Sequence, residues 1–256
     1  MISKARIKYL HSLELKKNRK AERVFVAEGP KVVGDLLEVL SARLVIATGE
    51  WLSRNAARLS ARTEVIEVTE EELIKASFLQ HPQDVIAVFP QWDEGDITVP
   101  TEELSLALDG VQDPGNLGTI IRIADWFGIR HIYCSPSTAD VYNPKVVQAT
   151  MGSIARVCVQ YCNLHSLFES LPPELPVYGT LLDGNDIYQQ HLMSRGIIVM
   201  GNEGNGISPE IRQRINRKLF IPNFPIGRET AESLNVAVAT AITCAEFRRQ
   251  ENAYKN

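Results

Sequence analysis

The sequence predicts an α/β protein of two domains, and three observations carry this prediction. Its 256 residues exceed one average domain and fall short of three. Hydrophobic residues make up 45% and charged residues 23%, a composition that buries a core and excludes disordered, collagen-like and coiled-coil proteins. Strand-like apolar segments alternate with helix-like segments along most of the chain, which favours a mostly parallel sheet.

The amino-terminal half starts this alternation at residue 24. Strand-like runs cover 24–29, 43–49, 64–68 and 84–89, and helix-like runs cover 30–40, 50–60 and 70–78. A polar stretch with Pro90, Gly95 and Pro100 follows and is typical of a linker, because it has neither periodicity nor an apolar face. We therefore expect a first domain over residues 1–95, a linker over 96–103 and a second domain over 104–256.

The carboxyl-terminal half resumes the pattern after the linker. Strands are expected at 104–110, 131–135, 155–160, 177–182, 197–202 and 218–222, and helices from about Gly115, from Ser208 and near the end of the chain. Three of these strands are followed by turns rich in glycine or asparagine, so each turn is a candidate for ligand binding.

The first turn lies in LDGVQDPGNLGTIIRIADWFGI and opens a helix. Arg122 lies off the apolar stripe of this helix, one turn in, and can point toward a group at the helix N-terminus, where a phosphate is favoured. The alternative is an exposed surface arginine, since one arginine in a helix is unremarkable.

The second and third turns are weak signals when each is taken alone. GNEGNGIS at 201–208 has the order GxxGxG, which is not the dinucleotide fingerprint, and the sequence contains no P-loop. The third turn precedes a helix for which we expect one apolar face. For Ser233 and Asn235 the alternative is helix capping, and Glu229 and Glu232 could be solvated acids. The expected face consists of Leu234, Ala237, Val238, Ala241, Ile242 and Ala245.

Charge is distributed unevenly along the chain. The net charge is −4, but residues 1–23 carry +6 and the remainder −10. Such a basic cluster could grip phosphates, or it could be the solvated face of an amphipathic helix. The same two interpretations apply to a second group, Arg212, Arg214, Arg217 and Lys218. The basic residues of the first segment are Lys4, Arg6, Lys8, Lys16, Lys17, Arg19, Lys20 and Arg23.

Several classes of protein are disfavoured by the sequence. No apolar run is long enough for a membrane span and the basic N-terminus does not resemble a secretory signal, so we expect a cytoplasmic protein without membrane contact. We interpret all four cysteines, Cys134, Cys158, Cys162 and Cys244, as buried thiols. We expect no metal site, because the spacing of the histidines does not fit a ligand set. The histidines are His11, His81, His131, His165 and His191.

The three turns, in this order and at these spacings, resemble the motifs of the SpoU/TrmH family of SPOUT methyltransferases. GNLGTIIR, ending at Arg122, resembles the first motif, GNEGNGIS the second, and IP followed by SLNVAVATAI the third. In the third motif Asn223 stands where methionine is usual, and the loop is longer. The amino-terminal domain is similar to the family's substrate-binding domain, and KKNRKAERVFVAEGPKVV is typical of its opening.

The resemblance implies a carboxyl-terminal SPOUT domain with a parallel sheet and a deep trefoil knot, a small amino-terminal RNA-binding domain, and a homodimer. It also implies that S-adenosylmethionine is the cofactor. Gly201, Ile221 and Leu234 are implied to contact this cofactor. The residues implied to line the reaction site are Asn116, Arg122, Glu203, Ser233 and Asn235.

The implied reaction moves a methyl group onto a ribose 2′-oxygen of RNA. A guanidinium is a poor proton acceptor, so we hypothesise that Arg122 clamps the phosphate beside the target ribose and lowers the pKa of the 2′-hydroxyl, while Asn116 orients the group. Glu203 would position the arginine or a backbone turn, or would merely cap amides. The basic segment 1–23 would track phosphates, which predicts RNA binding that falls steeply with salt.

The sequence is compatible with three functions. The leading one is an RNA 2′-O-ribose methyltransferase acting on ribosomal RNA, with transfer RNA as an alternative substrate. A non-catalytic RNA-binding protein that retains the fold is the second. A nucleotide-dependent oxidoreductase is the third, and it lacks its GxGxxG fingerprint.

Overall fold

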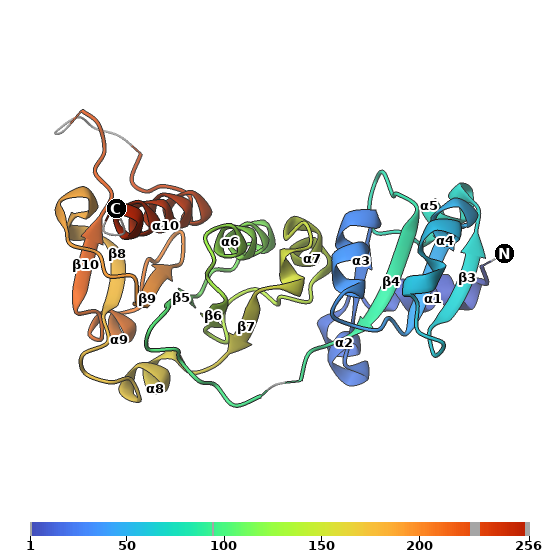
Figure 1. The fold of residues 1–256 in the computed structure, drawn as a ribbon, viewed down its shortest axis with the longest axis horizontal. Coiled ribbons are helices and arrows are strands. Elements are labelled where there is room, and N and C mark those ends of the chain that lie inside the picture. Colours follow the sequence, from blue (N-terminus) through green and yellow to red (C-terminus); the bar gives the residue numbers. More distant parts are fainter. Residues whose placement is uncertain (1, 94, 226–230, 254–256) are drawn as a thin grey trace. The chain divides into compact units, whose positions relative to one another are not determined.

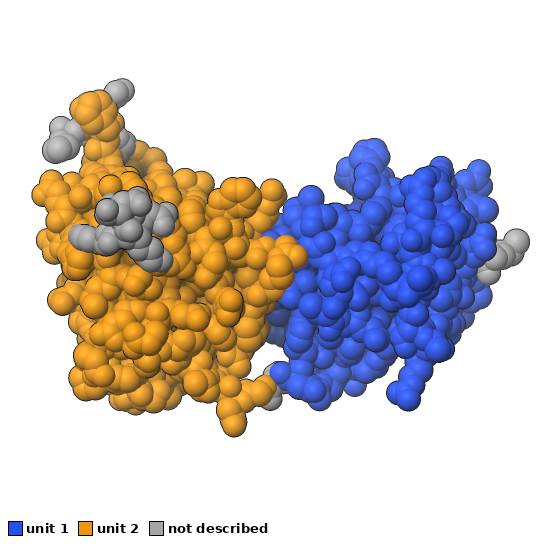
Figure 2. All heavy atoms as spheres, in the orientation of Figure 1, with its two compact units in different colours: residues 1–94, 140–155 blue, residues 95–139, 156–256 orange. Residues whose placement is uncertain are grey.

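The alternating segments form two α/β units in a computed structural model that describes residues 2–93, 95–225 and 231–253 (Figure 1). One unit holds residues 1–94 and 140–155, and the other holds residues 95–139 and 156–256 (Figure 2). The carboxyl-terminal half thus gives one segment to the first unit. The expected domain boundary at 96–103 stays a prediction. It did not include residues 140–155 in the first domain.

The first unit contains a four-stranded sheet in the order β1-β4-β2-β3. Strands β2 and β3 are parallel, and β4 runs antiparallel to both β1 and β2. The strands are β1 Val24–Glu28, β2 Leu44–Thr48, β3 Glu64–Val68 and β4 Val85–Pro90. The helices are α1 Lys4–Ser12, α2 Lys16–Glu22, α3 Pro30–Leu37, α4 Gly49–Asn55, α5 Glu70–Ala76 and α7 Pro144–Ala149, with 3-10 turns at Ala56–Arg58 and Ser153–Ala155.

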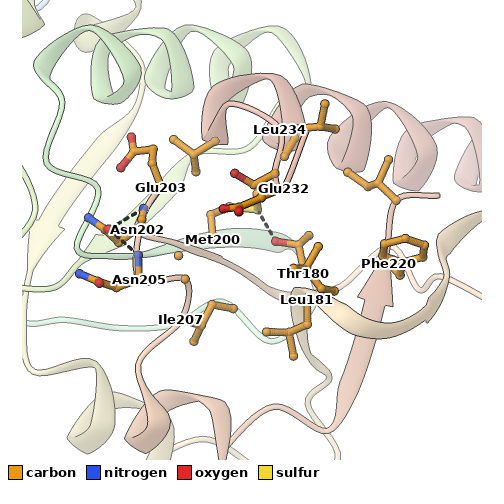
Figure 3. A pocket seen from close by; sticks show the side chains of 18 of the residues that line it. Thr180, Leu181, Met200, Asn202, Glu203, Asn205, Ile207, Phe220, Glu232 and Leu234 are labelled. Carbon is orange, nitrogen blue, oxygen red and sulfur yellow. Dashed lines mark hydrogen bonds between the residues drawn. The ribbon is translucent and has the colours of Figure 1, made fainter. Parts of the chain in front are cut away.

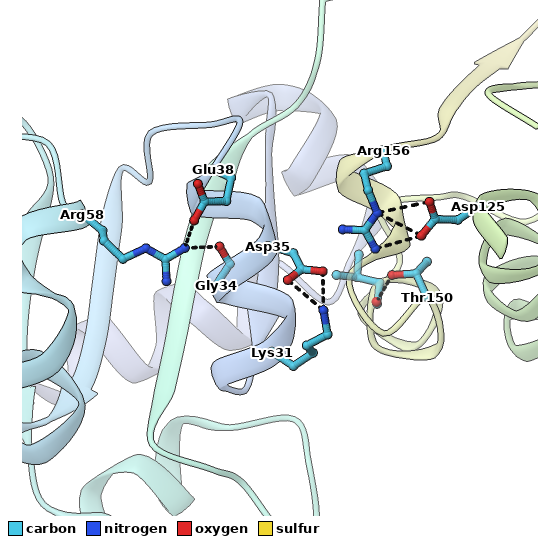
Figure 4. A network of polar contacts seen from close by, with 9 residues as sticks. Lys31, Gly34, Asp35, Glu38, Arg58, Asp125, Thr150 and Arg156 are labelled. Carbon is cyan, nitrogen blue, oxygen red and sulfur yellow. Dashed lines mark hydrogen bonds and ion pairs between the residues drawn. The ribbon is translucent and has the colours of Figure 1, made fainter. Parts of the chain in front are cut away.

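Short polar contacts define the helix ends and surfaces in this unit. Thr69 and Glu72 form a reciprocal capping box at the start of α5, which satisfies two backbone N–H groups that the helix leaves unpaired. On α3, Lys31 pairs with Asp35 at 2.7 Å, as Figure 4 shows. Such exposed pairs contribute at most about 1 kcal/mol each, so the sheet and its buried residues provide most of the stability.

A buried ion pair fixes residues 140–155 within the first unit. Arg19 in α2 is only 1% exposed, and its guanidinium donates to the Asp140 carboxylate at 2.6 Å and to the carbonyl oxygens of Leu13 and Glu14. Breaking a buried pair costs about 3–5 kcal/mol, because one charge is left without compensation. Tyr142 adds an aromatic contact to Phe25, with 5.1 Å between ring centroids.

The second unit contains a six-stranded sheet in the order β10-β8-β9-β5-β6-β7, and every pairing in it is parallel. The prediction of a parallel sheet is confirmed. The strands are β5 Leu104–Asp109, β6 His131–Cys134, β7 Cys158–Tyr161, β8 Val177–Asp186, β9 Gly196–Gly201 and β10 Arg217–Phe220. The helices are α6 Pro114–Trp126, α8 Leu164–Glu169, α9 Pro209–Arg212 and α10 Val236–Ala253, with a 3-10 turn at Ile187–Gln189.

Helices α6 and α10 pack side by side in this unit (Figure 1). The Arg248 Nε donates to the carbonyl oxygen of Phe127 at 2.8 Å and so connects α10 to the end of α6. The apolar face expected for the last helix is wrong in phase, because Val238 and Ala245 are exposed. Residues buried in its place include Thr240 and Thr243, whose hydroxyls donate to backbone carbonyls of the same helix and can therefore be buried.

The cysteine interpretation needs one clear correction. Cys134 and Cys244 are buried, but Cys158 is exposed and Cys162 lies between these extremes. Cys158 begins β7, which is an edge strand and is therefore covered on fewer sides than a central strand. Burial raises the pKa of all four thiols.

The trefoil knot implied by the resemblance stays a prediction. In the ranges that the structure describes, none of the helices combines the length and apolar character that a membrane crossing requires.

Candidate functional site

The candidate site begins where two central strands of the second unit end side by side. Strands β5 and β9 pair in parallel, and in their register Asp109 lies opposite Gly201. The first and second glycine-rich turns therefore start at the same edge of the sheet. Ligands of open α/β sheets bind at this carboxyl edge. The Asp109 carboxylate also accepts from the backbone N–H of Ser208 at 2.7 Å, which joins the end of the second turn to β5.

Three of the predicted reaction-site residues, one from each motif, form a hydrogen-bonded chain. Asn116 Nδ2 donates to Glu203 Oε1 at 2.6 Å, and Asn235 Nδ2 donates to Asn116 Oδ1 at 2.9 Å. Asn116 lies in the first turn of α6, which Asp113 caps by accepting the Asn116 backbone N–H at 2.7 Å. Glu203 thus contacts a side-chain amide, not the backbone amides of the capping alternative.

Asn235 has two roles that the sequence presented as alternatives. Its side-chain oxygen accepts from the backbone N–H groups of Ala237 and Val238, which caps the start of α10, while its amide nitrogen donates to Asn116. The cap fixes the side chain in one orientation, and that orientation aims its N–H at Asn116. Ser233 is exposed at the same loop end and lines the adjacent cavity.

Asn202 organises the second turn and was not identified from the sequence. Its Nδ2 donates to the Gly110 carbonyl at 2.8 Å, and its Oδ1 accepts from the N–H groups of Gly204 and Asn205 at 2.9 Å each. Its backbone also exchanges two hydrogen bonds with Gly206. The signal was available, because asparagine side chains commonly fold a following turn onto themselves.

Gly201 is required by a close backbone approach. A Cβ atom at this position would lie 2.3 Å from the carbonyl carbon of Gly206 and 2.4 Å from the nitrogen of Ile207. No side chain fits in that space, so the turn can fold back on β9 only from a glycine. The fold of the turn therefore requires glycine at position 201, independently of the cofactor contact predicted for this residue.

A cavity of about 630 Å³ opens beside these residues (Figure 3). Its apolar walls include Leu181, Met200 and Phe220. Predicted residues from the second and third motifs line it, and these are Gly201, Glu203, Ile221, Ser233 and Leu234. A cavity with apolar walls and a few convergent polar groups suits a nucleoside-sized ligand. The residues that line this cavity therefore fit the implied cofactor, S-adenosylmethionine. Glu229 lies outside the described residues.

Charged groups at the cavity are mostly paired. Asp183 binds Lys218 at 3.2 Å and also contacts Arg212. The hydrogen bond from Lys218, followed by the contact with Arg212, lowers the pKa of the Asp183 carboxyl. Within the described ranges, no group of His, Cys, Asp and Glu side chains is arranged to hold a metal ion.

Among the predicted site residues, Arg122 neither lines this cavity nor belongs to the hydrogen-bonded chain of Glu203, Asn116 and Asn235. It is exposed on α6 together with Thr119 and Trp126, and it has no hydrogen-bond or ion-pair partner among the described residues. A helix turns by about 100° per residue, so Arg122 faces a different direction from Asn116, six positions earlier. Within a single chain, Arg122 is therefore an exposed surface arginine, which is the alternative that the sequence left open.

Comparison with known proteins gives two matches to family models. Residues 103–245 match the SpoU rRNA methylase family, and residues 4–87 match the MRM3-like substrate binding domain. The chain is 31% identical to the 23S rRNA (guanosine(2553)-2'-O)-methyltransferase RlmP of Bacillus subtilis, over 95% of this chain and 96% of the relative.

Two solved structures resemble the whole chain. A protein of the TrmH family from Porphyromonas gingivalis is 42% identical, with a TM-score of 0.87 over 98% of this chain and 99% of that one. An rRNA methyltransferase from Sinorhizobium meliloti with bound AdoMet is 32% identical, also with a TM-score of 0.87, over 97% of this chain and 96% of that one.

Gly201→Ala tests the close approach at the second turn. We expect a loss of about 1–3 kcal/mol in the free energy of unfolding, because the added methyl group meets backbone atoms that cannot move aside cheaply. Gly204→Ala is the matched control, since its Cβ would meet only Asn202 Oδ1, at 3.6 Å. Denaturant unfolding of both variants measures the difference. Equal stability of the two variants would contradict the conclusion that the close backbone approach requires glycine at position 201.

Proposed function

Because this chain belongs to the SpoU rRNA methylase family, we propose that it transfers a methyl group from S-adenosylmethionine to a ribose 2′-oxygen of ribosomal RNA. The observation that carries the proposal is the hydrogen-bonded chain Glu203–Asn116–Asn235, of which Glu203 lines the cavity. A protein that only retained the fold would not need three motifs to converge on one side-chain amide. The amino-terminal match to a substrate binding domain supports RNA as the substrate.

In this proposal the cavity residues Gly201, Ile221 and Leu234 hold the cofactor. When bound, the cofactor supplies an electrophilic methyl group, so the protein has to align the ribose hydroxyl and ease the loss of its proton. Asn116 is fixed on both sides, by Asn235 at its oxygen and by Glu203 at its nitrogen. It is therefore preorganised to orient the hydroxyl without a rearrangement during the reaction.

Arg122 supplies positive charge where the hydroxyl becomes an oxyanion. A guanidinium beside the ribose and its phosphate lowers the pKa of the 2′-hydroxyl and stabilises the charge that develops on oxygen. Its planar pair of N–H groups binds a phosphate in two places, which a lysine cannot do. Arg122 is exposed in a single chain and is not among the residues that line the cavity, so in this proposal another molecule places it at the site.

We propose that a second copy of the chain provides this placement. Trp126, on the exposed face of α6 with Arg122, is 85% exposed, and Val238 on the neighbouring α10 is 48% exposed. Large apolar side chains exposed on two helices that pack together are a feature of protein interfaces. The apolar face that the sequence assigned to α10 would then be buried in a homodimer, and Arg122 would act at the site of the partner.

The amino-terminal basic segment separates into structural arginines and available lysines. Arg6 pairs with Glu64 at 2.6 Å, Arg23 pairs with Asp93 at 2.9 Å, and Arg19 is the buried partner of Asp140. The lysines of α1 and α2 are exposed and have no hydrogen-bond or ion-pair partner among the described residues. These are Lys4, Lys8, Lys16, Lys17 and Lys20. We propose that the lysines contact RNA phosphates.

A map of ribose methylation in total RNA, with and without the gene, tests the proposed function. We expect one defined mark in ribosomal RNA to disappear without the gene and to return with the wild-type protein. Arg122→Ala should lower the methylation rate by about a hundredfold or more, and Arg122→Lys should recover little of it, because a lysine cannot bind in two places. A mark in transfer RNA would redirect the substrate assignment, and an unchanged methylation map would overturn the function.

Mixed dimers test whether Arg122 acts in the partner's site. Arg122→Ala and Asn116→Ala chains, each inactive alone, are combined by co-expression with different tags and purified as mixed dimers. If Arg122 acts across the interface, one site of each mixed dimer has both residues intact and methylation activity returns. Mixed dimers as inactive as either parent would place Arg122 in the site of its own chain.

Lysine replacement tests the RNA contacts of α1 and α2. Lys8→Gln, Lys16→Gln and Lys20→Gln together should weaken RNA binding and flatten its salt dependence, with the log–log slope reduced by about 0.7–0.9 for each phosphate that is no longer neutralised. The matched control removes three paired charges, in Lys31→Gln, Arg54→Gln and Arg58→Gln. Fluorescence anisotropy over a salt series measures the slope, and equal slopes for the two variants would remove the lysines from the interface.

A further inference from the structure

Three carboxylates line the cavity, and two of them already have partners. Asp183 is bound by Lys218 and Arg212, and Glu203 accepts the hydrogen bond from Asn116. The third is Glu232, for which the described part of the chain provides neither a hydrogen bond nor an ion pair. Figure 3 shows its side chain in the middle of the residues that surround the cavity.

The cations at the cavity do not balance these carboxylates. Arg212 is the one lysine or arginine among the described residues that line it, and Arg212 is already paired with Asp183. The lining therefore carries a net negative charge next to apolar walls such as Met200, Phe220 and Leu234. A cavity lined by one sign of charge raises the local concentration of ligands of the opposite sign.

The cofactor and the product of the proposed reaction differ by one positive charge. S-Adenosylmethionine has a sulfonium, and S-adenosylhomocysteine has a neutral thioether at the same place. An enzyme that turns over has to bind the first and release the second, although the adenosine and amino-acid parts of the two molecules are identical. Apolar contacts with the extra methyl group can contribute about 1–3 kcal/mol to this selection, and the positive charge is the second difference that the protein can recognise.

We infer that Glu232 selects the charged methyl donor over the neutral product. Its carboxylate attracts a positive charge in the cavity and makes no such contact with a thioether. This inference rests on the proposed function, since it assumes that the cavity holds the cofactor. Glu232 directly precedes Ser233 and Leu234, two predicted residues that line the same cavity, so one short segment combines an apolar contact with a charge contact.

Calorimetric titration of the full chain with three ligands tests the inference without measuring activity. S-Adenosylmethionine and sinefungin both carry a positive charge at or beside the sulfur position, and S-adenosylhomocysteine does not. Glu232→Gln should weaken binding of the two cationic ligands by roughly fivefold, the effect of one unit charge about 4 Å away in water-like surroundings, and should leave S-adenosylhomocysteine unchanged. Because Glu232 is exposed, the difference should shrink at high salt.

Glu210→Gln is the matched control, because Glu210 is an exposed acid on α9 that does not line the cavity. It should leave all three affinities unchanged. Equal weakening of all three ligands by Glu232→Gln would overturn the inference, since it would assign the carboxylate to the amino group that they share. Unchanged affinities would overturn it as well. Failure of the wild-type chain to bind any of the three ligands would instead overturn the proposed function.

Discussion

Parallel pairing of β5 with β9 brings two glycine-rich turns to one edge of the sheet, and the rest of the site is built on that register. Asp109 and Gly201 lie opposite each other, so the loop toward Asn116 and the loop through Glu203 begin side by side. A shift of one residue would move one of these turns along the sheet edge and turn its side chains to the other face. The register is supported by buried apolar residues on both strands and by the contact of Asp109 with the Ser208 N–H.

At this edge of the sheet, the turns are held in place by side chains that form hydrogen bonds with backbone groups and with one another. Asn202 connects the second turn to Gly110, and Asn235 caps α10 while it holds Asn116. Each asparagine side chain offers both a donor and an acceptor, so it can bind an N–H group on one element and an acceptor on another, whereas a carboxylate only accepts and an ammonium only donates. In this way side-chain amides connect the three motifs, and the carboxyl group of Glu203 lies at one end of the hydrogen-bonded chain.

Much of this arrangement could be predicted from the sequence, and the remainder depends on contacts between distant residues. The alternation of apolar segments predicts the parallel sheet of the second unit, and the three motifs contain Asn116, Glu203 and Asn235, which the structure joins by hydrogen bonds. The pattern could not show that Arg19 is buried, because its partner Asp140 lies far along the chain in a segment with no strong periodicity. The pattern also could not show which basic residues of segment 1–23 form ion pairs, because ion pairing depends on neighbours in space.

The phase of α10 shows how a wrong prediction still carries information. The apolar face assigned to this helix is left exposed at Val238 and Ala245, and polar threonines are buried in its place. The adjoining helix α6 also exposes a large apolar side chain, because Trp126 is 85% exposed, and exposed apolar patches often mark sites of protein interaction. Helix α10 therefore has two faces, one that packs within the chain and one that the proposed homodimer would bury. On this account the exposure of Arg122 has the same origin, because a residue that completes a partner's site has to point away from its own.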